Sequence, residues 1–134
     1  MDVDELRRLP PLAGVSETGL ARLLTRAAEL EAEEGQVLAL QDDPGAGMFI
    51  LCDGTVSVEL RSGSLELGPG DFFGELALLV DDGARVARVR ATTPVRCLSI
   101  PRADFLALVE TEPSFALHML RELARRLTEA RAAV

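Results

Sequence analysis

The pattern of apolar and polar positions divides the chain into a helical beginning, a strand-rich middle and a helical end. A short helical turn near residues 4–9 ends at the proline pair Pro10 and Pro11. Ser16 is a typical N-cap, and apolar residues follow it at helical spacing, namely Leu20, Leu23, Leu24, Ala27 and Ala28. These signals predict a helix near residues 17–28 that buries one face.

The middle of the chain, from residue 30 to residue 100, consists of short apolar or alternating runs separated by turn residues. The runs predict strands at residues 36–40, 48–52, 55–60, 64–67, 85–91 and 95–100. The dipeptides Asp53-Gly54 and Ser62-Gly63 predict hairpins. Because helical patterns do not alternate with these strands, the sequence favours a mainly β fold, an antiparallel sandwich or barrel with helices at both ends.

The last part of the chain predicts two helices. An apolar segment at residues 102–109 is the first, and Glu112-Pro113-Ser114 separates it from the second. The second helix has an apolar stripe and a charged side: Met119, Leu120, Leu123, Ala124 and Leu127 on the one, and Arg121, Glu122, Arg125, Arg126, Glu129 and Arg131 on the other. This stripe could pack on the strands or pair with a second copy, and we expect a homodimer.

Length and composition are those of one folded domain. The 134 residues fit N-terminal helices in 1–29, strands in 30–101 and C-terminal helices in 102–134, and 48% of residues are hydrophobic. No apolar run reaches the ~18 residues of a membrane span, and the first residues lack the basic and apolar regions of a leader. We therefore expect a cytoplasmic protein that does not bind membranes.

Charge and residue usage argue against several function classes. With 22 acidic residues against 14 arginines, the net charge is −8, so we expect no direct DNA binding. The two cysteines, Cys52 and Cys97, lie in apolar runs and are expected to be core residues. A single histidine, His118, does not suffice for the metal site of a barrel enzyme. Without a recognisable nucleophile setting either, the chain is not expected to be an enzyme.

The richest chemistry lies in residues 70–79 and at Arg85. Gly74 lets the backbone approach a ligand closely, and a short helix at residues 74–79 would direct free N–H groups toward an anion. Arg85 could bind the same anion with its guanidinium fork. Glu75 fits beside an anion only if the ligand also brings hydroxyl groups. A sugar phosphate meets both demands, although an internal Glu75–Arg85 ion pair is the simpler structural alternative.

Several of these segments resemble the cyclic-nucleotide-binding domain of catabolite activator protein and of kinase regulatory subunits. Residues 34–38 resemble its entry strand and residues 48–58 its central hairpin. The run Gly-Asp-Phe-Phe-Gly-Glu-Leu-Ala-Leu at 70–78, followed by Arg-Val-Ala at 85–87, resembles its phosphate-binding cassette, which we place at residues 70–88. The resemblance implies a jelly-roll barrel and a role in signal transduction.

The resemblance also implies residue roles. The backbone of Gly74, Leu76 and Ala77 would bind the cyclic phosphate, Glu75 would accept from the ribose 2′-hydroxyl, and Arg85 would pair with a phosphate oxygen. Apolar residues would line the site of the base, namely Val56, Val58, Leu65, Leu67 and Phe73. Val86 stands where members that prefer cGMP often have threonine, so cAMP is the expected ligand, with cGMP second. No other cofactor is implied.

The chain departs from the family pattern at several positions. Asp42 replaces a common glycine, residues 80–84 are one residue longer than in kinase subunits, and Ala130 and Arg131 replace hydroxyl residues that contact adenine in the activator. Whether Arg88 lies on the same face of its strand as Val86 or on the opposite face is not determined by the sequence. The match covers a sensor with no output domain attached. An alternative is therefore a degenerate domain that no longer binds nucleotides and acts as a dimeric scaffold.

Overall fold

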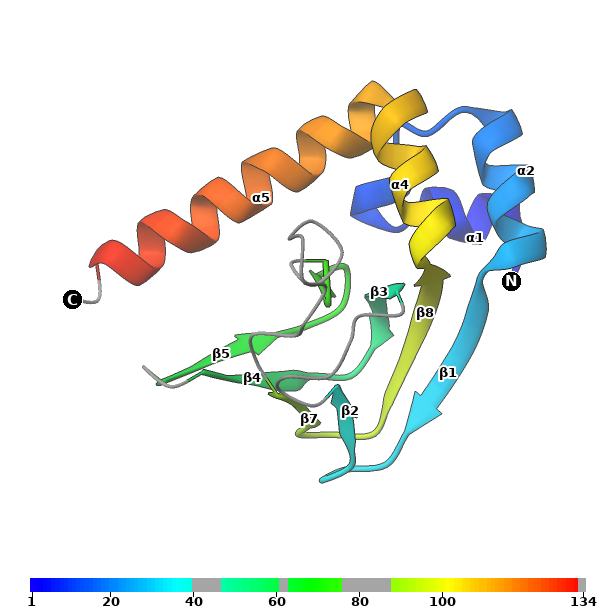
Figure 1. Ribbon diagram of the computed structural model, residues 1–134. Coiled ribbons are helices and arrows are strands. Elements are labelled where there is room, and N and C mark those ends of the chain that lie inside the picture. The colour runs from blue at the N-terminus through cyan, green and yellow to red at the C-terminus, as the bar shows by residue number, and fades with distance from the viewer. Residues whose placement is uncertain (40–46, 61–62, 76–87, 133–134) are drawn as a thin grey trace.

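Two four-stranded antiparallel sheets and two groups of helices make up the described part of the protein (Figure 1). The structure is a computed structural model that describes residues 1–39, 47–60, 63–75 and 88–132. The first sheet has the order β1 (Ala28–Ala32), β8 (Val95–Pro101), β3 (Gly47–Asp53) and β6 (Phe72–Phe73). The second has the order β2 (Val37–Ala39), β7 (Arg88–Ala91), β4 (Val56–Leu60) and β5 (Gly63–Leu67). The predicted mainly β class is confirmed, but among the described residues no strand pairing closes the sheets into a barrel.

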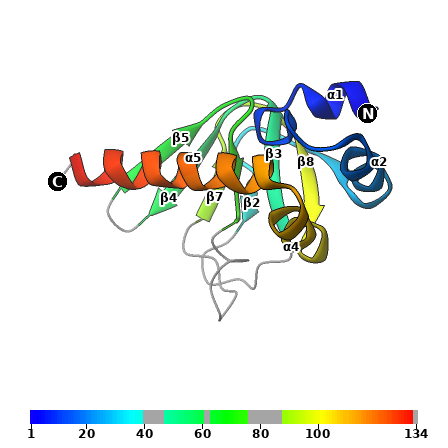
Figure 2. The same cartoon turned by 90° about the horizontal axis from the view of Figure 1, so that it is seen from above.

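The described helices lie at the two ends of the chain, as predicted, and the short helix predicted at residues 74–79 falls mostly outside the described residues. They are α1 (Val3–Arg7), the 3₁₀ turn η1 (Pro10–Leu12), α2 (Glu17–Arg26), α4 (Arg102–Thr111) and α5 (Pro113–Ala132). Figures 1 and 2 show α1, α2 and α4 gathered at one end, while α5 runs from there to the opposite side of the molecule. In the described ranges, no helix is both long and apolar enough to cross a bilayer.

Strand β3 separates two hydrophobic clusters because its side chains alternate between two buried faces. Met48 and Ile50 face the helices and share a cluster with Phe105 of α4 and Phe115 of α5. Leu51 faces the second sheet and belongs to the cluster between the sheets. Burial on both faces explains why residues 48–52 form a continuous apolar run rather than an alternating one.

One predicted hairpin is wrong and the other is confirmed. Strands β3 and β4, on either side of Asp53-Gly54, belong to different sheets and do not pair. Gly54 has φ of 86°, and a Cβ there would lie 2.2 Å from the carbonyl oxygen of Pro94, so the glycine serves a sharp corner between sheets. In contrast, β4 and β5 form the hairpin predicted at Ser62-Gly63. Their pairing begins where Val56 lies opposite Leu67 and ends where Leu60 lies opposite Gly63.

The strand β1 was missed by the sequence prediction, which extended the helix near residues 17–28 into its first residue. Helix α2 ends at Arg26, and β1 pairs with β8 from Ala28 with Ser99 to Ala32 with Val95. Four of its five residues are exposed, because β1 is an edge strand. Its sequence, Ala-Glu-Leu-Glu-Ala, therefore carries little of the burial that makes a strand recognisable.

Candidate functional site

A tight turn leads into the predicted cassette. The Asp71 carboxylate accepts from the Gly68 N–H at 2.9 Å, and the Asp71 N–H donates to the Gly68 carbonyl at 3.0 Å. Beyond the turn, β6 pairs with β3, which places Phe72 opposite Ile50 and Phe73 opposite Phe49. Phe72 therefore joins the cluster beneath the helices, and Phe73 joins the cluster between the sheets.

The residues that follow β6 bring a carboxylate into a buried position. Gly74 has φ of 90°, a left-handed conformation that favours glycine, and it turns the chain after Phe73. Glu75 is 3% exposed and is the only buried polar or charged residue in the described part of the chain. A buried carboxylate is costly unless charged or hydrogen-bonding groups surround it. Its position is therefore the strongest structural indication of a site.

Arg126 of α5 covers this position. Its Nη1 lies 3.5 Å from Oε1 of Glu75, and its Nη2 donates to the Phe72 carbonyl at 2.7 Å. The guanidinium carbon lies 4.4 Å from the centre of the Phe72 ring, a cation–π arrangement. The Arg126 side chain is only 13% exposed. The sequence prediction placed Arg126 on the charged side of the helix, opposite the apolar stripe that packs or pairs, whereas the structure turns Arg126 inward.

The inner face of α5 explains the error. Phe115 and Met119 are buried at the start of the helix, and Glu122 and Arg126 continue the same face at helical spacing. The residues of α5 that face the rest of the molecule are thus apolar at the start of the helix and charged where the helix passes the cassette. A search for apolar periodicity therefore selects a different set of residues as the inward face. The predicted stripe is in part exposed, since Leu120 is 65% and Leu127 57% accessible.

Glu122 is held by two arginines of its own helix. Hydrogen bonds from Arg125, opposed by partial burial and assisted by the charge of Arg126, lower the pKa of the Glu122 carboxyl. Its Oε1 also lies 3.3 Å from Nε of Arg126. Glu122 therefore helps to orient the guanidinium that covers Glu75.

The predicted apolar wall exists as one cluster. Val58 lies directly opposite Leu65 on the paired strands, and both are half-buried. Leu67 and Phe73 are buried in the same cluster, and the Phe73 ring stacks on Phe49 with centres 5.0 Å apart. The structure brings these residues together beside the end of β6. Their contact with a base stays a prediction.

Other predicted residues lie outside what the structure describes. These are Asp42, Leu76, Ala77, residues 80–84, Arg85 and Val86, together with the side chains of Ala130 and Arg131. The open question of Arg88 is answered. It lies opposite Glu59 in the β4–β7 pairing, and its Nη2 is 2.5 Å from the Glu59 carboxylate, on the face away from the cluster between the sheets.

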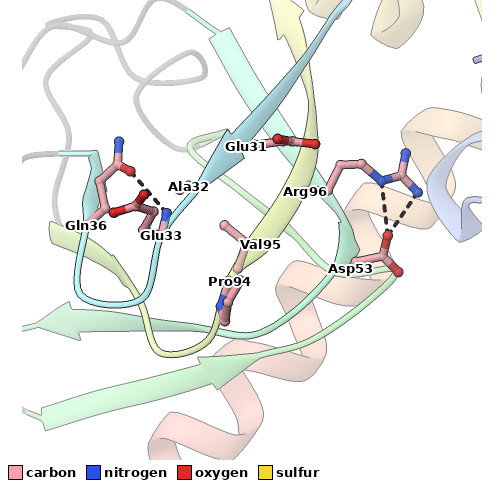
Figure 3. Close-up of a pocket in the computed structure, with 8 residues that line it drawn as sticks. All are labelled: Glu31, Ala32, Glu33, Gln36, Asp53, Pro94, Val95 and Arg96. Carbon is pink, nitrogen blue, oxygen red and sulfur yellow. Dashed lines mark hydrogen bonds and ion pairs between the residues drawn. The ribbon is translucent and has the colours of Figure 1, made fainter.

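A pocket outside the cassette lies where β1, β8 and the β3–β4 corner meet (Figure 3). Its lining consists of Glu31, Ala32, Glu33, Gln36, Asp53, Pro94, Val95 and Arg96. Arg96 is held at 3.0 Å by both Asp53 and Glu29. None of the predicted ligand-binding residues that the structure describes lines this pocket. Among the described residues, no group of His, Cys, Asp and Glu side chains could hold a metal ion.

Comparison with known proteins decides the family. Residues 29–112 match the family model described as the cyclic nucleotide-binding domain. The chain belongs to this family. A solved structure, the catabolite activator protein of Thermus thermophilus, is 31% identical, with a TM-score of 0.72 over 92% of this chain and 61% of that one. The jelly-roll fold inferred from the resemblance is therefore confirmed.

Other relatives show the domain within longer proteins. "Glutaminase 2" of Bradyrhizobium diazoefficiens is 37% identical over 92% of this chain but only 20% of its own length. The regulatory subunit of a cAMP-independent protein kinase A from Trypanosoma brucei shares the fold, with a TM-score of 0.79 at 22% identity, over 98% of this chain and 48% of that one. The chain spans between 20% and 57% of the length of the curated relatives that it matches. The similarity to each of them therefore concerns the binding domain.

Proposed function

We propose that this chain is a regulatory sensor that binds a cyclic nucleotide, with cAMP preferred over cGMP, and that it has no catalytic activity of its own. The observation that carries the proposal is the buried Glu75 carboxylate beside the left-handed Gly74. Family membership supports it, since the matched family is defined by nucleotide binding. The valine at position 86 supports cAMP, because it cannot hydrogen-bond to guanine.

The three parts of a cyclic nucleotide would meet three kinds of group. The ribose 2′-hydroxyl would donate to Glu75, and the cyclic phosphate would accept from Arg85 and from backbone N–H groups of Gly74, Leu76 and Ala77. The base would lie against the cluster that contains Val58 and Leu65. No step requires a metal ion or another cofactor.

Calorimetric titration with cAMP and cGMP tests the proposal. Wild-type protein should bind cAMP more tightly than cGMP. The Glu75→Gln variant removes a hydrogen bond to a charged acceptor, worth about 1.5–3 kcal/mol, so cAMP binding should weaken about 10- to 100-fold. Arg85→Ala should weaken binding at least as much. Arg88→Ala is the matched control, because Arg88 pairs with Glu59 on the outer face and should leave the affinity unchanged.

A thermal-shift screen gives the decisive negative result. A ligand present at 100 times its dissociation constant adds ~2.7 kcal/mol to the free energy of unfolding. No shift with any cyclic nucleotide would refute the sensor and favour the second candidate, a degenerate dimeric scaffold. The Arg126–Glu75 ion pair is the observation that favours this second candidate, because it engages the carboxylate that the ribose would need.

We also propose that the protein is a homodimer formed through α5. Leu117, Leu120 and Leu127 are 45%, 65% and 57% exposed, and with Ala124 they have the spacing of a two-helix seam. The double variant Leu120→Glu/Leu127→Glu should sediment as a monomer. Leu30→Glu, on the exposed edge strand β1, is the control and should not change the mass. A wild-type monomer would refute the proposal.

We propose that this domain itself does not bind DNA directly. A net charge of −8 opposes a broad contact with phosphates. Fluorescence anisotropy with random duplex DNA at low salt should show no binding, with or without cAMP.

A further inference from the structure

The junction between α4 and α5 is fastened to the start of α2 by one side chain. Glu112 stands between the two helices with an extended backbone, φ −120° and ψ 92°. Its Oε1 accepts from the Ser16 N–H at 2.7 Å, and its Oε2 accepts from the Ser16 hydroxyl at 2.9 Å. The Ser16 oxygen in turn accepts from the Gly19 N–H at 3.1 Å. Glu112 therefore completes the cap of a helix that lies 96 residues earlier in the chain.

The contact is close as well as polar. A Cβ on Gly14 would lie 2.7 Å from Cβ of Ser114, and a Cβ on Gly19 would lie 3.0 Å from the Glu112 carboxylate. Larger side chains at these glycines would collide with Ser114 and Glu112. The residues that lead into α2 therefore contact the first turn of α5, and α2 itself contacts Glu112 at the junction.

A second link holds the other end of α2. Nε of Arg26, in the last turn of α2, lies 3.3 Å from a carboxylate oxygen of Asp104, in the first turn of α4. Because the Glu112 link joins the beginning of α2 to the end of α4, the two helices run antiparallel and are fastened at both ends. Figure 1 shows them side by side.

The α4–α5 junction is the end about which α5 would rotate, and Arg126 lies far from it along the helix. From Pro113 to Arg126 the helix rises about 20 Å. A rotation of roughly 10° at the base would move the Arg126 end by about 3.5 Å, enough to break a hydrogen bond of ordinary length. The bond from Arg126 to the Phe72 carbonyl is 2.7 Å long. The position of Arg126 over the cassette therefore depends on how firmly the junction is held.

We propose that Glu112 is a positioning residue that couples the distal end of α5 to α2. When Arg126 leaves Phe72 and Glu75, the displacement of α5 passes through Glu112 and loosens the first turn of α2. The inference rests on the proposed function, in which a bound nucleotide would contact Glu75 and thereby displace Arg126. It adds Glu112 as the residue through which that displacement reaches α2.

Amide hydrogen exchange of the full chain tests the coupling without any ligand. The Arg126→Ala variant should accelerate exchange in α5 and, about fivefold, in the first turn of α2, which is the size expected for one lost hydrogen bond. Arg121→Ala, at an exposed position of the same helix, is the control and should change neither. In a Glu112→Ala background, Arg126→Ala should have no additional effect on α2. Glu112→Gln keeps an acceptor and should preserve part of the coupling, and Glu110→Ala is its surface control.

Three results would overturn the coupling. One is an Arg126→Ala variant that loosens α5 and leaves α2 unchanged. Another is an effect on α2 that is equal with and without Glu112. The third is no effect on α5 at all, since Arg126 would then not hold the helix. Because no nucleotide is added, failure of the protein to bind cyclic nucleotides is a separate outcome that concerns only the proposed function.

Discussion

Replacing Arg126 with alanine should destabilise the protein by about 3 kcal/mol. The side chain donates to the Phe72 carbonyl at 2.7 Å, a hydrogen bond from a charged donor worth about 1.5–3 kcal/mol. Its position 4.4 Å from the Phe72 ring centre adds about 0.5–2 kcal/mol. Little of this is lost to solvent screening, because Arg126 is 13% and Glu75 4% exposed. The sum agrees with the 3–5 kcal/mol typical of removing one partner from a buried ion pair.

Urea unfolding followed by circular dichroism measures the change. Domain stabilities of about 5–15 kcal/mol leave the variant folded, with an unchanged dependence on urea concentration. Arg125→Ala is the control, since Arg125 pairs with Glu122 and Glu129 at an exposed position and should have a much smaller effect. In a double-mutant cycle with Glu75→Gln, the two changes should not be additive. An Arg126 variant no less stable than the Arg125 variant would refute the reasoning.

Two titratable groups outside the cassette give further predictions. Burial lowers the pKa of His118, so the folded protein disfavours the charged form, and stability should fall as the pH drops through about 6.5. Between pH 7.5 and 5.5, urea unfolding should show a smaller loss of unfolding free energy in His118→Gln than in the wild type. Glu59 and Glu122 do not contribute in this window, because the lowered pKa values of their carboxyls affect stability only at more acidic pH. An equal loss in both proteins would exclude His118 as the cause. Burial raises the pKa of Cys97 to about 11, so at pH 8 only about one thiol in a thousand is ionised. A disulfide reagent should therefore modify Cys97 only after unfolding, and rapid labelling of the folded protein would contradict its burial.

The sequence predicts those elements whose burial follows a simple period. Helix α2 is an example, because its Ser16 cap and its buried Leu20 and Leu23 are visible as a local pattern. Strand β1 is the opposite case, since it is held by pairing with β8 and buries almost none of its own side chains. The corner at Gly54 has the residues of a hairpin, and only the position of Pro94 in the folded chain reveals a turn between sheets.

The same distinction applies to the candidate site. Gly74 and Glu75 could be predicted as candidate site residues because the proposed cassette is contiguous in the sequence and its residue types have a direct chemical reason. Arg126 could not, since it meets Glu75 across more than fifty residues and sits on a helix face that an apolar pattern marks as solvated. Its burial follows from the path of α5 over β6, which is a property of the packed molecule.

The change of the inner face of α5 from apolar to charged would link the proposed ligand binding to a displacement of α5. An entirely apolar face would hold the helix through contacts that a polar ligand cannot exchange. Arg126 instead holds α5 through a carbonyl, an aromatic ring and the Glu75 carboxylate. Glu75 is also the group proposed to accept from the ribose, so the ligand and the helix would share one acceptor. A ligand shifts a conformational equilibrium only by interacting differently with its two states. Competition or cooperation at Glu75 would supply that difference, and the contacts of Glu112 with Ser16 would carry it beyond α5.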